Sequence, residues 1–170
     1  MIINASLPTW IDAFIGLGSN LNRPVQQIQS ALQALQMLSQ CRFIRHSSLY
    51  LTPPLGQPNQ PSYVNAVAWL QTQLSPMELL MQLQIIEHNQ GRVRSTVRWD
   101  ARTLDLDLLL YGEWHINEPQ LSIPHPHLHR RAFVLIPLHE IVNENFYIPH
   151  IGYLRDLLQM CDCTGIERLI

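Results

Sequence analysis

The residues best suited to chemistry are two aspartates in the segment from Thr103 to Tyr111. Asp105 and Asp107 alternate with leucines, and a period of two predicts a strand with one apolar and one acidic face. The apolar face is expected to carry Leu104, Leu106, Leu108 and Leu110. Two carboxylates at this spacing lie on the same side of a strand, roughly 6–7 Å apart along the backbone. They can therefore share hard cations such as Mg²⁺.

Solvated acids paired with nearby arginines are the simpler interpretation of Asp105 and Asp107. Two ionised carboxylates side by side, however, repel each other unless something neutralises them. Because the rest of the strand is leucine and a cationic segment precedes it, we favour metal binding over a solvated pair.

Four arginines surround a tryptophan directly before this strand. They are Arg92, Arg94, Arg98 and Arg102, placed around Trp99. The segment has few apolar residues and no clear period, so we expect a mobile loop. Trp99 could stack on an arginine or a bound ring, or close the site as a lid. Arginines beside a metal platform are the arrangement that phosphate chemistry needs.

The composition restricts how the chain could bind a nucleotide. The 170 residues are 46% hydrophobic and 14% charged, which fits one globular domain spanning 1–170. All eleven basic residues are arginine, so a P-loop, which needs a lysine, is excluded. Arginine, backbone amides and metal would have to hold the phosphates instead. The net charge of −2 gives no reason to expect a nucleic-acid partner.

The cysteines and the termini predict a cytoplasmic protein. Cys41, Cys161 and Cys163 are an odd number with one C-x-C, which argues for reduced thiols. Met1–Trp10 has no basic residue ahead of a long apolar run, so we expect no signal peptide. The longest apolar run, Ala132–Leu138, is too short to span a bilayer. We expect no membrane partner, and a monomer.

The order of the expected elements predicts an α+β fold. Strands are expected at Ala13–Leu17, Arg42–Leu51, Ser62–Gln71 and Thr103–Tyr111, with helices opened by Pro24 and by the capping box Ser75-Pro-Met-Glu78. This order is the ferredoxin-like βαββαβ core, an antiparallel sheet with helices packed on one face. C-terminal additions are expected as a hairpin return at Gly112–Glu118 and helices at Val134–Val142 and Gly152–Met160.

Three further features each allow a structural and a functional interpretation. Gly18 permits either close backbone approach or a positive φ, and is only a weak sign of phosphate binding. Four prolines after Thr52 make an extended loop, for which a surface connection is favoured over a ligand-binding wall. Tyr63 and Asn65 share one side of a strand and are either an exposed pair or contacts for a heterocycle.

Three histidines at alternate positions form the last candidate group. The run reads Pro124-His125-Pro126-His127-Leu128-His129-Arg130-Arg131. A zinc site is disfavoured, because it would need a further carboxylate or cysteine in reach and the prolines constrain the geometry. A histidine beside arginines suits a phosphate contact better, and we assign no role to His127 or His129.

Several motifs occur in a recognisable order between about residues 12 and 142. They are Gly18-Ser-Asn-Leu21, Thr52-Pro-Pro-Leu-Gly56, Tyr63-Val-Asn65, Glu87 with Gly91-Arg-Val-Arg94, Arg98-Trp-Asp-Ala-Arg-Thr-Leu-Asp-Leu-Asp107, and Pro124-His125 with Arg131-Ala-Phe133. In order and spacing they resemble the 6-hydroxymethyl-7,8-dihydropterin pyrophosphokinase family. The chain departs from the family at Pro126, where an aromatic residue is common, and in the following Leu128–Arg130.

The resemblance implies a reaction in folate biosynthesis. A pyrophosphoryl group would move from the co-substrate ATP to the hydroxymethyl oxygen of the pterin, releasing AMP. Asp105 and Asp107 would hold two Mg²⁺ ions that bridge the triphosphate. Arg92 and Arg102 would neutralise charge that develops during transfer.

The resemblance also implies the substrate contacts. ATP would be bound by Gln84, Glu87, Arg94, Trp99, Leu108 (through its backbone), His125 and Arg131. The pterin would stack between Tyr63 and Phe133, with its edge bound by Asn65 and by backbone groups of Thr52, Pro54 and Leu55. The loop that carries Trp99 would close over ATP and exclude water.

Two other classes of function explain the sequence less well. A nucleotide- or pterin-binding module without catalysis would have no need of two metal ions, so the paired aspartates argue against it. An RNA-binding sheet would present exposed aromatic residues and a basic face. The net charge of −2 and the acidic strand argue against that function as well.

Overall fold

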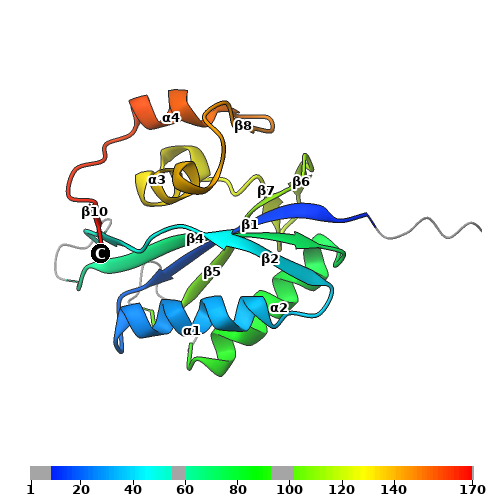
Figure 1. The fold of residues 1–170 in the computed structure, drawn as a ribbon, viewed down its shortest axis with the longest axis horizontal. Helices are drawn as coiled ribbons and strands as arrows, with labels where there is room; N and C mark the ends of the chain where they lie inside the picture. Colours follow the sequence, from blue (N-terminus) through cyan, green and yellow to red (C-terminus); the bar gives the residue numbers. More distant parts are fainter. Residues whose placement is uncertain (1–8, 55–59, 93–101, 170) are drawn as a thin grey trace, which may run out of the picture.

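The computed structural model describes residues 9–54, 60–92 and 102–169 (Figure 1). Within these ranges six strands form one antiparallel sheet. The strands are β1 (Ile11–Ser19), β2 (Cys41–His46), β3 (Tyr50–Thr52), β4 (Tyr63–Thr72), β5 (Asp105–Tyr111) and β10 (Glu167–Arg168). The helices are α1 (Pro24–Gln36), α2 (Pro76–Asn89), α3 (Ala132–Ile141) and α4 (Leu154–Met160), with a 3₁₀ turn at Leu128–Arg130.

The sheet confirms the ferredoxin-like core that the order of elements predicts. Its strands run in the order β10-β3-β4-β1-β5, and β2 also pairs with β4. The two central strands are therefore β4 and β1, which are the longest, and the acidic strand β5 lies at one edge. This position leaves β5 beside β1, with Gly18 opposite Asp105 and Gly16 opposite Asp107.

The two helices of the βαββαβ core, α1 and α2, pack on one face of the sheet as expected, and the C-terminal helices cover the other face. Figure 1 shows α1 and α2 on one side and α3 with α4 on the other. Two separate cores result. The first lies under α1 and α2 and includes Ile15, Ile28, Leu35, Leu83 and Leu106. The second lies under α3 and includes Phe14, Val67, Leu109, Leu135 and Leu138. The C-terminal additions thus cover a sheet face that the βαββαβ core alone would leave open.

The two core helices form for the reasons that the sequence suggests. In α2 the Ser75 hydroxyl accepts from the Glu78 N–H while the Glu78 carboxylate accepts from the Ser75 N–H, which completes the capping box. The chain leaves this helix through Gly91, whose φ of 78° is the left-handed conformation that favours glycine. The capping box thus fixes the start of α2, and the turn at Gly91 ends the helix directly before Arg92.

The second predicted strand, Arg42–Leu51, is broken into β2 and β3. The buried Ser47 causes the break, because its side chain replaces a backbone partner in the sheet. Its N–H donates to the Val67 carbonyl at 2.9 Å, and its hydroxyl oxygen accepts from the Val67 N–H at 3.0 Å. The chain can therefore bend after β2 while β4 keeps its hydrogen bonds.

The strict alternation predicted for β5 ends at Leu108. In the pairing with β1, Ile15 lies opposite Leu108 and Phe14 opposite Leu110, so Leu109 is an additional residue in β5. Leu109 and Leu110 both join the second core, and Tyr111 takes the place in the first core that was predicted for Leu110. Asp105 and Asp107 precede this irregularity and keep the predicted common side.

The additions after β5 differ from the predicted hairpin. The segment Ile116–Asn117 (β6) pairs with Ser122–Ile123 (β7) rather than returning along β5. A second short pair joins β8 (Tyr147–Ile148) to β9 (Gly152–Tyr153), so α4 starts at Leu154 and not at Gly152. The C-terminal segment, to which the sequence assigns no role, adds β10 to the edge of β3.

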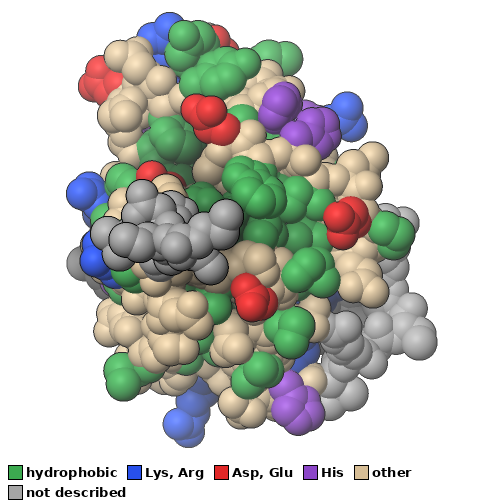
Figure 2. All heavy atoms as spheres, turned by 90° about the vertical axis from the view of Figure 1, so that its right-hand side faces the viewer, with side chains coloured by type: hydrophobic (Ala, Val, Ile, Leu, Met, Phe, Trp, Pro, Cys, Tyr) green, Lys and Arg blue, Asp and Glu red, His purple; other side chains and the backbone are tan. Residues whose placement is uncertain are grey.

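The end of the second core near the start of β1 reaches the surface. A hollow there is lined by Phe14, Trp69 and Phe146 together with Asp12 and Arg45. The Trp69 indole donates to Asp12 at 2.8 Å, and its ring stacks on Phe14. Figure 2 shows apolar side chains gathered on one face of the molecule, where they border acidic side chains and histidines. Among the described helices, none has the length and apolar character to cross a membrane.

The packing of α3 predicts the effect of a truncation in the second core. Leu135 is fully buried, so Leu135→Ala should lower the free energy of unfolding by about 2–5 kcal/mol in urea denaturation. The matched control Met160→Ala, at a side chain that is 84% exposed, should change it by less than about 0.5 kcal/mol. Equal stabilities for the two variants would contradict this account of α3.

Candidate active site

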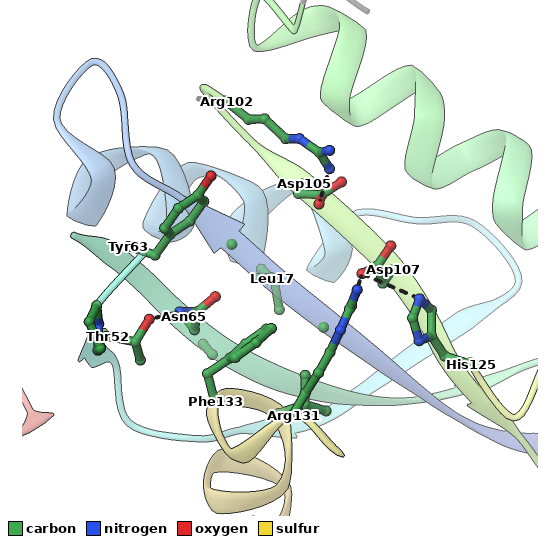
Figure 3. A pocket seen from close by; sticks show the side chains of 15 residues that line it. Leu17, Thr52, Tyr63, Asn65, Arg102, Asp105, Asp107, His125, Arg131 and Phe133 are labelled. Carbon is green, nitrogen blue, oxygen red and sulfur yellow. Dashed lines mark hydrogen bonds and ion pairs between the residues drawn. The ribbon is translucent and has the colours of Figure 1, made fainter. Parts of the chain in front are cut away.

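A cavity of about 180 Å³ lies on the side of the sheet that α3 covers (Figure 3). Its lining comes from β1, β3, β4 and β5, from the start of α3, and from residues that flank these elements. The lining residues are Gly16, Leu17, Gly18, Thr52, Pro53, Tyr63, Asn65, Ala66, Arg102, Asp105, Asp107, His125, Arg131, Phe133 and Val134. Residues from five separate parts of the sequence therefore meet at one place, including most of the predicted site.

Two glycines of β1 help to leave room for the cavity. A side chain at Gly18 would lie 3.1 Å from the Asn65 amide oxygen, and one at Gly16 would lie 3.3 Å from Leu109. Of the two alternatives for Gly18, close approach of neighbouring groups is therefore confirmed, and its φ lies outside the positive range. Both glycines are at register positions opposite the aspartates of β5.

Asp105 and Asp107 point from the same side of β5 toward the cavity, as their spacing predicts. The Asp105 carboxylate pairs with Arg92 at 2.6 Å and with Arg102 at 2.5 Å. The Asp107 carboxylate pairs with Arg131 at 3.3 Å, and the His125 Nε2 atom lies 3.9 Å from it. Each aspartate thus has its own cationic partners, and the two sets approach from different sides.

The electrostatics of this pair favour a cation. Burial and the negative charge of Asp105 raise the pKa of Asp107 to about 6, although Arg131 opposes that shift. A carboxylate whose charged form is disfavoured gains from a divalent cation placed between it and its neighbour. Within the described residues no three acidic, histidine or cysteine side chains converge as a metal site. Phosphate oxygens and water would therefore have to complete the coordination of ions held by the two aspartates.

His125 is held as a neutral imidazole. Burial, followed by the nearby Arg131, lowers the pKa of His125 to about 4. Its Nδ1 atom accepts a hydrogen bond from the His127 N–H at 3.2 Å, so the ring proton is assigned to Nε2. Because Nε2 faces the acidic side of the site, His125 can donate one hydrogen bond to an anion there.

Glu87, near the end of α2, lies outside the cavity lining and is almost completely buried. Its carboxylate accepts from the Leu106 N–H at 2.7 Å and forms an ion pair with Arg92. Burial raises the pKa of Glu87, while the Leu106 bond and Arg92 oppose the rise. Glu87 therefore links the end of α2 to β5 and orients Arg92, a structural contact that the sequence does not predict. Gln84 is half-buried one turn earlier in α2, outside the cavity lining.

Arg102 is positioned by the polar end of β1. The buried Asn20 accepts from the Arg102 N–H at 2.8 Å through its side chain, and its own N–H donates to the Arg102 carbonyl at 3.1 Å. The adjacent Ser19 hydroxyl donates to the Thr103 carbonyl at 2.6 Å. The sequence gives Ser19 and Asn20 no separate role, but two polar residues at the end of a buried strand are a sign of such bonds.

The residues expected to bind a heterocycle surround the apolar part of the cavity. Tyr63 and Phe133 approach it from the sheet and from α3, as Figure 3 shows. Asn65 is 5% exposed and donates to the Thr52 hydroxyl at 2.7 Å, which fixes the orientation of its amide. Its amide oxygen faces Gly18 and can accept a hydrogen bond from the edge of a ligand.

Some predicted contacts lie elsewhere. The Leu108 side chain is buried in the first core, so only its backbone is a candidate contact. Pro54 was predicted to contact the pterin, but the adjacent Pro53 lines the cavity and Pro54 does not. Leu55, Arg94 and Trp99 lie outside the described residues, as does Arg98.

The fold and the cavity together define an α+β protein with a site for phosphate transfer to a ring-bearing substrate. Residues 14–143 match the family 7,8-dihydro-6-hydroxymethylpterin-pyrophosphokinase. The chain belongs to this family.

Proteins of similar sequence match nearly the whole of this chain. A Pseudomonas aeruginosa protein named 2-amino-4-hydroxy-6-hydroxymethyldihydropteridine pyrophosphokinase is 48% identical over 92% of this chain and 95% of its own length. A Haemophilus influenzae protein of the same name is 49% identical over 88% of this chain and 92% of its own length. Among solved structures, a Plasmodium falciparum HPPK-DHPS variant has a TM-score of 0.70 at 16% identity, over 92% of this chain. This chain spans 46% of that longer protein, and the likeness shows the fold alone.

The contacts of Glu87 predict different effects for two substitutions. Glu87→Ala leaves the Leu106 N–H without its acceptor and should lower the free energy of unfolding by about 1–3 kcal/mol. Glu87→Gln keeps a carbonyl acceptor, so its loss in urea denaturation should be smaller. An equal loss in both variants would contradict the bond to Leu106.

Proposed function

We propose that the chain catalyses transfer of pyrophosphate from ATP to the hydroxymethyl group of 6-hydroxymethyl-7,8-dihydropterin, with release of AMP, in folate biosynthesis. The observation that carries this proposal is one cavity that joins an aromatic pocket to two carboxylates and to Arg102 and Arg131. Membership of the pyrophosphokinase family supports it. A binding module without catalysis is not favoured, because nothing in binding alone requires adjacent anions.

The pterin is proposed to bind in the apolar part of the cavity. Tyr63 and Phe133 offer aromatic faces on two sides, which suits a flat ring. Asn65, whose amide donates to the Thr52 hydroxyl, would hydrogen-bond the ring edge beside backbone groups of Thr52, and the contact of the Pro54 backbone remains a prediction of the family resemblance. Because Asn65 is already oriented, little freedom is lost when the ring binds. The hydroxymethyl group would then point toward Asp105 and Asp107.

The phosphates are proposed to bind over the acidic side of β5. Asp105 and Asp107 would hold Mg²⁺, proposed as two ions, which supplies charge neutralisation and alignment of the triphosphate. The arginines that pair with these aspartates would be free to contact phosphate once cations take their place. Arg92 and Arg102 are assigned to the transferred group, and Arg131 with the neutral His125 to the flanking phosphate oxygens.

The proposal also includes the cellular location, the oligomeric state and the remaining nucleotide contacts. All three cysteines are free thiols, which fits the cytoplasm. A monomer is proposed as the oligomeric state. The nucleoside contacts of Gln84, Glu87 and the Leu108 backbone, and those of Leu55, Arg94 and Trp99, remain predictions of the family resemblance.

A product assay tests the proposed reaction. Purified protein with ATP, Mg²⁺ and the reduced hydroxymethyl pterin should form AMP and pterin pyrophosphate, followed by chromatography. Omission of the metal by chelation, of ATP or of the pterin should each abolish AMP formation. ADP as the nucleotide product would refute pyrophosphoryl transfer.

The aspartate pair gives the sharpest prediction for a variant. Asp107→Ala should reduce kcat by more than about 100-fold, because one of the two anionic metal ligands is lost. The exposed aspartate variant Asp156→Ala is the matched control and should keep its activity. Circular dichroism should show both variants folded. Activity of Asp107→Ala close to that of Asp156→Ala would rule out the metal assignment.

A further inference from the structure

The last turn of α3 carries a glutamate that is bonded to two other parts of the chain. Glu140 accepts from the Ser48 N–H at 2.9 Å, from the Ser48 hydroxyl at 2.8 Å and from the Tyr50 hydroxyl at 2.9 Å. The Arg168 guanidinium pairs with the same carboxylate at 3.0 Å. These four contacts join α3 to the start of β3 and to β10. None of the four residues lines the cavity.

The partners of Glu140 are themselves tied together. Arg168 also donates to the Ser48 hydroxyl at 2.8 Å, and the following Leu169 N–H donates to the Leu49 carbonyl at 2.8 Å. Burial, and then the bond to Glu140, raises the pKa of Tyr50 to about 12, so its hydroxyl keeps its proton and remains a donor. The carboxylate therefore accepts from a set of groups held in place by β3 and β10, which makes it a fixed attachment point for α3.

The helix attached at this point carries an aromatic wall of the cavity. Phe133 precedes Glu140 by seven residues, about two helical turns, so both side chains leave α3 on the same side. Tyr50 lies opposite Asn65 in the sheet, and Thr52 lies opposite Tyr63. These four residues of β3 and β4 therefore share the sheet face that α3 covers. The hydrogen bond from Tyr50 to Glu140 joins the sheet to α3. Phe133, two turns earlier in α3, and Asn65 line the cavity between the same helix and the sheet.

We propose that Glu140 is a positioning residue that sets the width of the pterin pocket. It would do so by fixing the distance of α3, and thus of Phe133, from Tyr63 and Asn65. This inference rests on the proposed function, in which the pterin occupies that pocket. A flat ring held between two aromatic side chains is sensitive to their separation, because stacking weakens as the faces move apart. Arg131, at the other end of the helix, has a separate tie to Asp107.

The expected consequence is a selective loss of pterin binding. Glu140→Ala should raise the KM for the pterin about tenfold, since displacements near 1 Å have effects of this order or larger. The KM for ATP should change by less than about twofold, because Asp105 and Asp107 lie on β5 and Arg131 keeps its own ion pair with Asp107. Tyr50→Phe removes a single bond and keeps the ring, so it should raise the pterin KM in the same direction but less. A general loss of stability would not separate the two substrates in this way.

The test is steady-state kinetics of AMP formation with each substrate varied, well below the melting temperature of every variant. Glu144→Ala, at an exposed glutamate just after the same helix, is the matched control and should leave both KM values unchanged. Glu140→Gln retains an acceptor oxygen for Tyr50 and should recover part of the loss. If Glu140→Ala does not fold, Tyr50→Phe decides the question with the same two KM values.

Three results would overturn the inference. The first is an unchanged pterin KM in Glu140→Ala or Tyr50→Phe. The second is an equal rise in the pterin KM and the ATP KM of Glu140→Ala. The third is a rise in the pterin KM of Glu144→Ala as large as that of Glu140→Ala. Failure of the proposed function would be recognised separately, because the unmodified protein would then form no AMP from the pterin. Activity of the unmodified protein with no pterin effect in the variants would reject only the role of Glu140.

Discussion

The site depends on the repulsion between two neighbouring carboxylates on one strand. Asp105 and Asp107 share a side of β5, and the structure balances their charge with cations from three directions. Arg92 comes from the end of α2, Arg102 from the segment before β5, and Arg131 from the start of α3. Because like charges so close need compensation, the pair favours either these arginines or metal ions. The exchange of one for the other is the basis of the proposed phosphate chemistry.

The second constraint is that this acidic face is also the face covered by α3. Glycines of β1 leave space beneath the helix, and Phe133 closes that space on one side. The C-terminal additions are therefore part of the site, although they are outside the βαββαβ core. Glu87 and Glu140, on different helices, tie their helices to β5 and to the residues just before β3 by accepting backbone hydrogen bonds.

The sequence predicts the core fold and the aspartate pair because both depend on local periodicity. Alternation along β5 up to Leu108 and the capping box of α2 are local signals, and the structure confirms both. The coverage of the second sheet face, the extra residue at Leu109 and the pairing of β10 depend on contacts between distant segments, which no local pattern records. The buried bonds of Ser47 and Glu87 were missed for the same reason, since a polar residue shows no sign of its partner in the sequence.

The most direct test of the central claim is a crystal structure with Mg²⁺, a non-hydrolysable ATP analogue and the pterin. The account predicts metal ions bound by the carboxylates of Asp105 and Asp107, with Arg92, Arg102 and Arg131 turned from the aspartates to phosphate oxygens. The pterin should lie between Tyr63 and Phe133. Metal ions bound elsewhere, with the arginines still paired to both aspartates, would contradict the account.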